Sequence, residues 1–458
     1  MLSLKRCIGI ILLLTTGAAN AQTPVTLKQL LSSVDQKAPQ LLTDSAAILI
    51  RESQATEVRN NWLPNLKLNY QADVGTSNNV TGPYFGFGII PSSSGGVHGT
   101  NVTTAASVNL GIAALDWEIY NFGAYGAANK VANADVTVQK DEFAQSKYQL
   151  QSFTISTYLQ LLRLQDFLTI QSRDIQRNLE IRRSIESLAK SGVKAGVDTS
   201  IAEAELSKAR LNYIEVANQL KQVQLQLSAV SGLPYTSIVA DSTTEAELIN
   251  QPIGLLFTPD TINHPLINYY RSIYQNSLQR EDLVKKQYNP KISLEAAAWD
   301  RGSSIDADGH YNSLGNGFGF DRDNYLVGIG ISYNLFDLRR KQLKLHTQKA
   351  STDYALKSLQ EQQQLLAVSA NQADVELVTA QQRLKEIPDQ LNAANNGYRQ
   401  KLSLYRSGLT DIIELNAALD ILYRAETDYV QAKYAYSNAL FQKAVTGNQL
   451  SLVLNLLK

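Results

Sequence analysis

The sequence predicts an α+β membrane protein, a duplicated half in which long coiled-coil helices alternate with pairs of amphipathic strands. Three observations predict this class: an apolar stripe that occurs twice, two helical stretches far longer than those of globular proteins, and four segments in which apolar and polar residues alternate. A period of about 3.6 residues is typical of a helix face, and a period of two is typical of a strand with one apolar side.

The duplication is visible in the segment 199–231. Its apolar residues step by four and three in turn, a spacing that keeps one seam of a helix against a partner helix. This stripe consists of Ala202, Leu206, Ala209, Tyr213, Val216, Leu220 and Val223. The residues 216 positions later are again all apolar: Ala418, Leu422, Ala425, Tyr429, Ala432, Tyr436 and Ala439. A period of this length indicates a duplicated half-molecule and not a short solenoid unit.

The first residues predict a secretory signal peptide, 1–21. Lys5 and Arg6 precede an apolar run, and Ala21 completes a small-x-small cleavage pattern. The only cysteine, Cys7, lies inside this segment, so we expect the mature chain to have no thiol, no disulfide and no lipid anchor. The mature chain would hold 40 basic and 42 acidic residues, and this balance argues against a nucleic-acid partner. No other stretch approaches 18 consecutive apolar residues, so only strands could enter a membrane.

The first repeat, 22–232, begins with a helical pattern from about 26 to 61, which a proline-containing segment ends. Two period-two segments follow, 66–74 and 104–119, and they predict a hairpin with a long loop. The apolar phase slips before Trp117, which indicates a β-bulge.

A helix of some 67 residues is predicted next, since no proline interrupts the pattern before Gly192. At about 1.5 Å per residue it would be roughly 100 Å long, which requires coiled-coil packing. Its expected seam is Leu150, Thr154, Thr157, Leu161, Leu164 and Leu168. The shorter helix 199–231 completes the repeat.

A proline-containing linker, 233–260, is predicted to separate the repeats, and the second repeat spans 261–447. Its strands are expected at 291–299 and 325–335, and its hairpin is ten residues shorter than the first because of a shorter loop.

The second long helix is expected at about 338–404, with a kink at Pro388. Residues 448–458 form a C-terminal tail.

Four strands of membrane-spanning length cannot close a barrel, and open edges are not tolerated in hydrocarbon. Several chains must therefore share one barrel: two chains would give eight strands and three would give twelve. An eight-stranded barrel is filled by its own side chains, whereas the inward set here is polar and small, as in Gly328, Gly330 and Ser332. This favours a wet lumen and twelve strands.

The chain resembles the TolC-type outer-membrane efflux factors over nearly all of its mature length. The resemblance rests on the duplicated layout, on the strand end Trp117-Glu118-Ile119-Tyr120-Asn121-Phe122-Gly123, and on the turns Ser191-Gly192 and Ser407-Gly408. It implies a homotrimer, a shared 12-stranded barrel in the outer membrane and a large periplasmic α-helical tunnel. It also implies a passive exit duct of a tripartite efflux or type I secretion system, docked through a periplasmic adaptor onto an inner-membrane pump.

The resemblance also predicts a periplasmic aperture near the Ser-Gly turns, one long helix away from the strands. Tyr405 matches the family's tyrosine before the turn and Glu414 matches the first of two constricting acids. Thr410 and Ala417 stand where the family has an arginine and the second acid, and Arg406 lies nearby. The residues expected at the aperture are Tyr405, Arg406, Asp411, Glu414 and Asp198.

The acids of this set have an alternative role as helix caps. Asp198 and Asp411 each precede a helical pattern, with an acid about three residues after Ser200 and after Asp411. If three copies converge, a ring of acids would favour cations, and Arg406 could pair with an acid of the neighbouring helix.

No catalytic, cofactor or metal site is predicted, and we expect no enzyme. The four histidines are scattered without ligand spacing, and Asp306-Ala307-Asp308-Gly309 resembles the start of a calcium loop without its later ligands. The glycine-rich segment 315–320 is not set in a strand-to-helix unit, so it is no nucleotide loop. Two other classes remain open: a periplasmic coiled-coil adaptor, and a surface binding protein that uses the glycine-rich loops.

Overall fold

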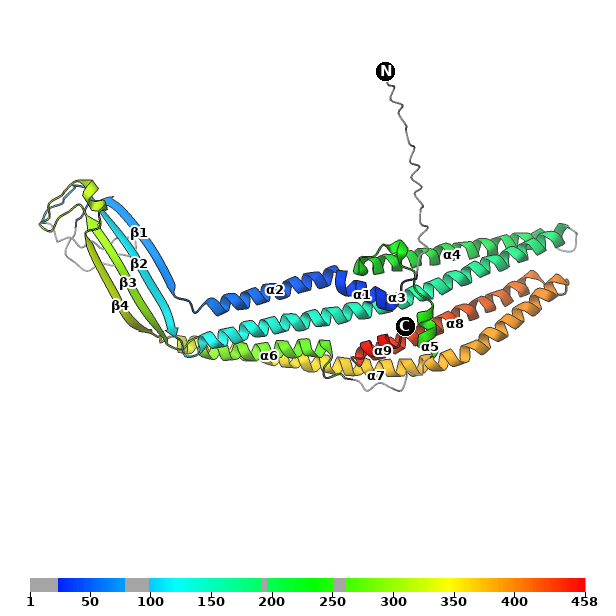
Figure 1. Ribbon diagram of the computed structural model, residues 1–458. Helices are drawn as coiled ribbons and strands as arrows, with labels where there is room; N and C mark the ends of the chain where they lie inside the picture. The colour runs from blue at the N-terminus through cyan, green and yellow to red at the C-terminus, as the bar shows by residue number, and fades with distance from the viewer. Residues whose placement is uncertain (1–23, 79–98, 191–195, 251–259, 458) are drawn as a thin grey trace, which may run out of the picture. The chain divides into compact units, whose positions relative to one another are not determined.

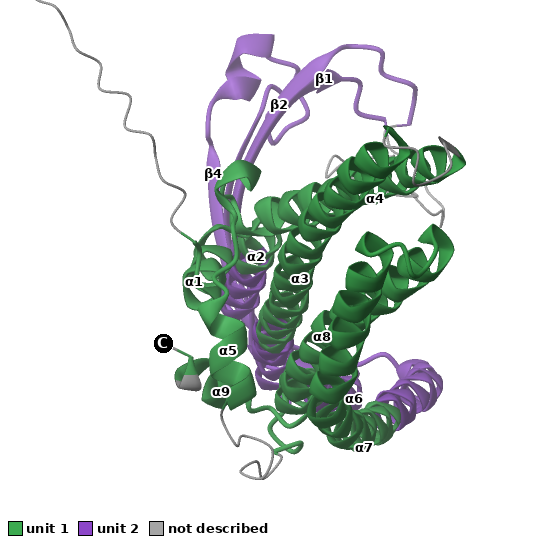
Figure 2. Cartoon of the chain, turned by 90° about the vertical axis from the view of Figure 1, so that its right-hand side faces the viewer, with its two compact units in different colours: residues 1–46, 141–269, 359–458 green, residues 47–140, 270–358 purple. Residues whose placement is uncertain are grey.

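The structure is a computed structural model that describes residues 24–78, 99–190, 196–250 and 260–457. The predicted signal peptide with Cys7 and the Ser191-Gly192 turn lie outside these residues. The chain divides into two compact units, residues 1–46, 141–269 and 359–458 in the first and residues 47–140 and 270–358 in the second (Figure 2).

The helices and strands alternate as two copies of one layout (Figure 1). The first copy holds α1 (Leu27–Lys37), α2 (Pro39–Asn60), β1 (Asn65–Gly75), β2 (Ala106–Tyr120), α3 (Ala124–Lys190) and α4 (Gly196–Ser231). Two short helices follow, η1 (Tyr235–Ser237) and α5 (Thr243–Asn250). The second copy holds α6 (Pro265–Lys286), β3 (Lys291–Ser303), η3 (Leu314–Phe318), β4 (Arg322–Ser332), α7 (Asp337–Arg406), α8 (Ile412–Thr446) and α9 (Leu450–Leu456). Within the described ranges, no helix is both long enough and apolar enough to cross a membrane.

The predicted single helix at 26–61 is wrong, because the structure divides it into α1 and α2 at Ala38. Ala38 has φ −59° and ψ 122°, the extended conformation that the ring of a following proline imposes. Thr26 begins α1 with a capping box, in which its Oγ1 accepts the Gln29 N–H at 3.3 Å and its own N–H donates to Gln29 Oε1 at 3.1 Å.

The two long helices are confirmed, α3 with 67 residues and α7 with 70. α7 continues through Pro388 as one helix. The predicted seam of α3 is buried at every position but Leu168, which is half-buried. α4 starts at Gly196, three residues before the predicted start. α9 gives the predicted C-terminal tail a helix of its own.

The core of the first unit gathers around Tyr158, whose side chain is fully buried. Its hydroxyl donates to the Val25 carbonyl at 2.9 Å and accepts the Asp241 N–H at 2.9 Å. Nearby Lys433 of α8 forms ion pairs with Asp166 of α3 and Glu245 of α5, each at 2.5 Å. These contacts join the predicted linker region to both repeats. They also provide partners for polar groups that burial removes from water.

The four strands of the second unit form one antiparallel sheet in the order β1-β2-β3-β4 (Figure 1). Both predicted hairpins are confirmed, although β2 begins at Ala106 and β4 ends at Ser332, short of the predicted residue 335. Lys291, the first residue of β3, pairs with Ser332, so the residues after Ser332 have no partner on β3. The chain then turns at Asn334, whose Oδ1 accepts the Phe336 N–H at 3.1 Å.

The register separates an apolar face of the sheet from a polar face, since cross-strand partners point to the same side. We define the apolar face by the following residues: Leu66, Leu68, Tyr70, Ala72 and Val74 of β1, Trp117, Leu115 and Ala113 of β2, Leu294, Ala296 and Ala298 of β3, and Tyr325, Val327, Ile329 and Ile331 of β4. Large members of this face are exposed, Leu68 at 79% and Tyr325 at 85%. The polar face carries Lys67, Asn69, Gln71 and Asp73 of β1 together with Gly328 and Gly330 of β4.

The predicted bulge before Trp117 is misplaced. β1 and β2 pair without interruption from Asn65↔Asp116 to Gly75↔Ala106, and the register shift lies between Glu118 and Tyr120 in the pairing with β3. Val108, Leu110 and Ile112 therefore lie on the polar face, opposite Asp73, Gln71 and Asn69. The apolar residues of β2 therefore change from one face of the sheet to the other, while the pairing of β2 with β1 stays regular.

Candidate functional site

The turn from α7 to α8 ends α7 with a Schellman motif. The Leu409 N–H donates to the Leu404 carbonyl at 2.9 Å, and the Gly408 N–H donates to the Tyr405 carbonyl at 3.0 Å. Gly408 has φ +75°, a left-handed conformation that a residue without Cβ adopts at no steric cost. The Ser407-Gly408 turn is thereby fixed in geometry.

Asp411 is the N-cap of α8, which confirms the helix-cap role predicted for it. Its Oδ1 accepts the Glu414 N–H at 2.9 Å. The same role is wrong for Asp198, and Ser200 with Glu203 forms no capping box, because α4 begins at Gly196 and all three residues lie inside it. Asp198 lies in the first turn, where a negative charge is still favourable next to the exposed N–H groups.

Glu414 has partners that the sequence does not reveal. Its Oε2 accepts from Lys401 Nζ at 2.5 Å and from Thr410 Oγ1 at 2.7 Å. These hydrogen bonds, together with the positive charge of Lys401, lower the pKa of the Glu414 carboxyl. Thr410, which stands where the resemblance implies an arginine, thus supports the acid by a neutral hydrogen bond.

Tyr405 and Arg406 face different surroundings although they are adjacent. Tyr405 is 1% exposed and packs with Ile181, Ile185 and Ile412. Burial, and secondarily the negative charge of Asp198, raises the pKa of the Tyr405 phenol. Arg406 is exposed at the last turn of α7. The structure therefore brings Asp411 and Glu414 together with Lys401 and Thr410, and leaves Tyr405 in the core and Arg406 at the surface.

A second polar cluster lies where α3 meets α8. Both nitrogens of the Arg177 guanidinium fork donate to Glu426, at 2.8 and 2.7 Å, and Arg173 approaches the same carboxylate at 3.6 Å. The Glu426 side chain is 8% exposed, and the hydrogen bonds that it accepts from Arg177 raise the pKa of that guanidinium. Arg177 also lies 6.0 Å from the ring centroid of Tyr398 of α7.

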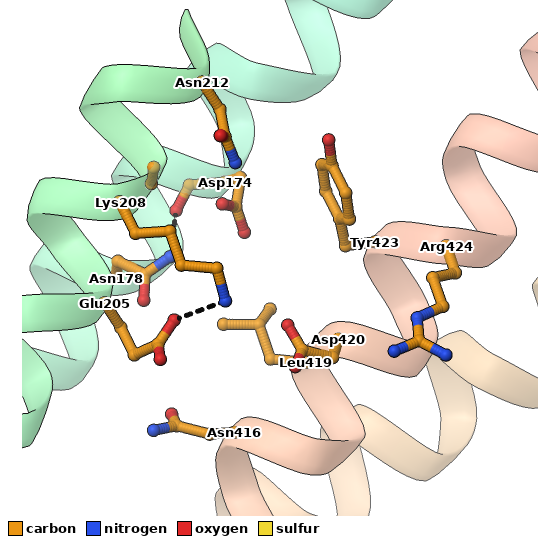
Figure 3. Close-up of a pocket in the computed structure, with 11 residues that line it drawn as sticks. Asp174, Asn178, Glu205, Lys208, Asn212, Asn416, Leu419, Asp420, Tyr423 and Arg424 are labelled. Carbon is orange, nitrogen blue, oxygen red and sulfur yellow. Dashed lines mark hydrogen bonds and ion pairs between the residues drawn. The ribbon is translucent and has the colours of Figure 1, made fainter.

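Next to this cluster a cavity of about 220 Å³ opens between α3, α4 and α8 (Figure 3). Its polar lining includes Asp174, Lys208 and Asp420, and Lys208 Nζ donates to Glu205 at 3.1 Å. Burial raises the pKa of Asp174 to about 6. The positive charge of Arg177 opposes this rise, and the negative charges of Glu426 and Asp420 add to it. The carboxyl therefore changes charge closer to neutral pH than an exposed aspartate does.

One cluster of possible metal-ligating groups occurs in the described ranges. Ligand-type atoms of Asp306, Asp308 and His310 lie within 4.8 Å of one another, and all three residues are exposed. Oδ1 of Asp306 already accepts the N–H groups of Asp308 at 3.1 Å and His310 at 2.8 Å. This geometry is that of an aspartate-stabilised turn, which needs no ion.

Comparison with known proteins agrees with the architecture. The family model described as outer membrane efflux protein matches residues 30–233 and 273–442. Comparison with curated proteins gives no match.

Several solved structures share the fold. The outer-membrane channel OprN is 19% identical, with a TM-score of 0.71 and coverage of 92% of this chain and 90% of OprN. VceC from Vibrio cholerae is 15% identical, with a TM-score of 0.72 and coverage of 92% and 96%. The CmeC outer-membrane channel of Campylobacter jejuni is 14% identical, with a TM-score of 0.74 and coverage of 93% and 86%.

Proposed function

Because the chain belongs to the outer membrane efflux protein family, we propose that it forms a trimeric channel, the passive exit duct of a tripartite efflux or type I secretion system. Its fold is that of the TolC-type outer-membrane channels, with a helical tunnel and strands that contribute to a β-barrel. The observation that carries the proposal is the four-stranded sheet with one exposed apolar face.

The edges of that sheet support the proposed trimer. β1 and β4 each pair on one side only in the described part of the chain. Unpaired backbone groups are not tolerated in the acyl-chain region, so these edges require strands from other copies. Glycines on the polar face, Gly328 and Gly330, leave room for water, which favours the 12 strands of three chains over the eight of two.

The proposed partners are a second and third copy of the chain, outer-membrane lipid, a periplasmic adaptor and an inner-membrane pump. The duct itself is proposed to catalyse no reaction and to need no cofactor. Membership of an outer-membrane channel family disfavours the periplasmic adaptor and the surface binding protein as alternatives. In this proposal the repeats are 22–232 and 261–447, joined by the segment 233–260.

The aperture is proposed to lie at the α7–α8 turn, formed by Tyr405, Arg406, Asp411, Glu414 and Asp198 of each chain. Glu414 supports this because its carboxylate is exposed and its partners Lys401 and Thr410 hold it in one orientation. Tyr405 supports it differently, since its burial ties the end of α7 to α3 and α8. Three convergent acids would favour cations.

Planar-bilayer recording combined with native mass measurement tests the function. The purified protein in detergent should have the mass of three mature chains, and it should give discrete, cation-preferring conductance steps after reconstitution. A protein that stays monomeric or dimeric and conducts no ions would refute the duct.

A further inference from the structure

The apolar face of the sheet is interrupted by polar and small residues at the strand ends that lead into the loops. On β2 these are Ser107, Asn109 and Gly111, and their cross-strand partners on β1 are the apolar residues Val74, Ala72 and Tyr70. On β3, Gly302 pairs with Asn109. In this part of the sheet the side chains of β1 are apolar. The inner strands β2 and β3 would expose hydroxyl, amide and backbone groups here if nothing covered them.

The segment 314–320, which contains η3, covers these groups. Ser107 Oγ donates to the Leu314 carbonyl at 2.5 Å, and Asn109 Nδ2 donates to the Phe318 carbonyl at 2.9 Å. Asn109 Oδ1 accepts the Gly302 N–H at 2.6 Å. As a result Ser107 is 0% exposed and Asn109 2% exposed. Both side chains donate to carbonyls of the segment, and Asn109 Oδ1 is satisfied by Gly302 of β3.

Glycines let the backbone of the segment contact the backbone of the sheet directly. A Cβ on Gly302 would lie 1.9 Å from the Gly319 carbonyl oxygen, and a Cβ on Gly317 would lie 2.1 Å from the Ser107 carbonyl oxygen. Neither position has space for a larger residue. The segment is therefore packed tightly on the sheet, directly over β2 and β3.

The segment exposes three large apolar side chains. Leu314, Phe318 and Phe320 are 43%, 45% and 56% exposed. The Phe320 ring meets the Tyr70 ring edge-on, with centroids 6.2 Å apart, and its edge lies 3.2 Å from where a Cβ of Gly111 would be. Exposed apolar side chains thus continue from Tyr70 of β1 onto Phe320 of the segment.

We propose that the segment 314–320 is a lipid-contacting element that replaces the strand surface of β2 and β3 in the acyl-chain region of the outer membrane. The inference rests on the proposed function, which makes the apolar face of the sheet the lipid-facing one. Its occupant is lipid and not another copy of the chain, because β2 and β3 are the inner strands and the edges that other copies would pair with belong to β1 and β4. The covered polar groups explain the arrangement, since each would be costly against acyl chains.

Site-directed spin labelling tests the proposal in the reconstituted channel. The only cysteine of the sequence is Cys7, within the predicted signal peptide, so single-cysteine variants label at one site. Phe318→Cys and Phe320→Cys report on the segment. Val327→Cys reports on the apolar face and Leu326→Cys on the polar face, a matched pair because the two residues are adjacent and both exposed.

Collision of the nitroxide with oxygen, which dissolves in lipid, is compared with collision with a water-soluble nickel chelate, in liposomes of phosphatidylcholine. Labels at 318, 320 and 327 should show a several-fold higher oxygen-to-nickel ratio than the label at 326. If 318 and 320 match 326 while 327 stays high, the segment faces water and this inference alone is overturned. If 327 also matches 326, the lipid-facing assignment fails with the proposed function. Only variants that keep the mass of the unlabelled assembly and its conductance are compared.

Discussion

Arg177 and Glu426 form a two-point ion pair that joins α3 of the first repeat to α8 of the second, with nitrogen–oxygen distances of 2.8 and 2.7 Å. At the offset of 216 residues the counterparts of these residues are Ala393 and Arg210, which cannot form the same pair. The pair therefore occurs once per chain and breaks the symmetry of the duplication. It joins the two halves at one defined position.

Truncation of Glu426 is expected to destabilise the protein strongly. Glu426→Ala leaves Arg177 without its carboxylate in a mostly buried position, and the loss of one partner of such a pair costs about 3–5 kcal/mol. Thermal unfolding in detergent, followed by circular dichroism, should show a clearly lower midpoint. The matched control is Glu52→Ala, which removes an exposed pair with Lys140 and should cost less than about 1 kcal/mol. Equal midpoints for the two variants would contradict a buried-pair role.

Asp174→Asn is expected to stabilise the protein above pH 6 and to change little at acidic pH. Folding raises the pKa of this carboxyl to about 6, so between its ordinary value and pH 6 the folded chain binds more protons than the unfolded chain. The unfavourable contribution of Asp174 is therefore present above pH 6 and disappears as the pH falls through 6 and then below the unfolded pKa.

The asparagine variant should gain on the order of 2 kcal/mol at pH 8 and converge with the wild type near pH 4. Denaturant midpoints at the two pH values measure this difference. A gain that is independent of pH would show that the variant acts through packing.

Ile329→Lys should impair assembly, and Gly330→Lys should be tolerated. Ile329 is 70% exposed on the apolar face, where a lysine near the middle of the bilayer costs about 2–4 kcal/mol. Gly330 lies on the polar face, and a Cβ there would be 2.9 Å from Glu295 Oε1, which places the lysine beside a carboxylate. The yield of assembled protein in the outer-membrane fraction is the measurement. The assignment of faces is lost if both lysines are tolerated equally.

The acids at the α7–α8 turn are expected to set cation preference. Glu414→Gln should reduce the cation-to-anion permeability ratio several-fold, and Arg406→Ala should raise conductance. Lys401→Met should raise the pKa of Glu414 toward its ordinary value, because the lysine is the main cause of the lowered pKa. Cation preference should then disappear at a higher pH than in the wild type.

Single-channel recording across a pH series measures both effects. Thr410→Val, which removes the neutral hydrogen bond to Glu414 and keeps Lys401, is the mild control. Wild-type conductance and selectivity in Arg406→Ala and Glu414→Gln would place the constriction elsewhere.

Periodicity in the sequence predicts which helices and strands form, but it does not predict where the pairing between two strands ends. The alternation in the sequence continues through Tyr333 and Leu335, yet β4 stops at Ser332 because β3 begins opposite it. Likewise Val108, Leu110 and Ile112 form an apolar stripe, but the pairing with β1 turns this stripe to the polar face. Face and length are properties of the paired strands, and a single strand does not contain them.

The same limit applies to the α7–α8 turn. Asp411 can be predicted as a cap because capping depends on residues three positions apart in the chain. Lys401 cannot be predicted as the partner of Glu414, since the two residues lie on different helices and meet only when the Gly408 turn is formed. The segment 314–320 shows this most clearly. Its glycines suggest a loop, and only the close approach to Gly302 shows what the loop covers.

The edge strands β1 and β4, which each pair on one side only in the described part of the chain, have a consequence for the rate of barrel assembly. A barrel made from one chain closes within a molecule, so its rate of closure is independent of concentration. Here β1 and β4 are the two edges of the sheet, and in the proposed trimer each pairs with a strand of a different chain. Closure is then a reaction between molecules, and its rate should rise more than proportionally with the number of chains at the membrane. Low expression would slow maturation itself, and chains awaiting partners would be the species exposed to periplasmic proteases.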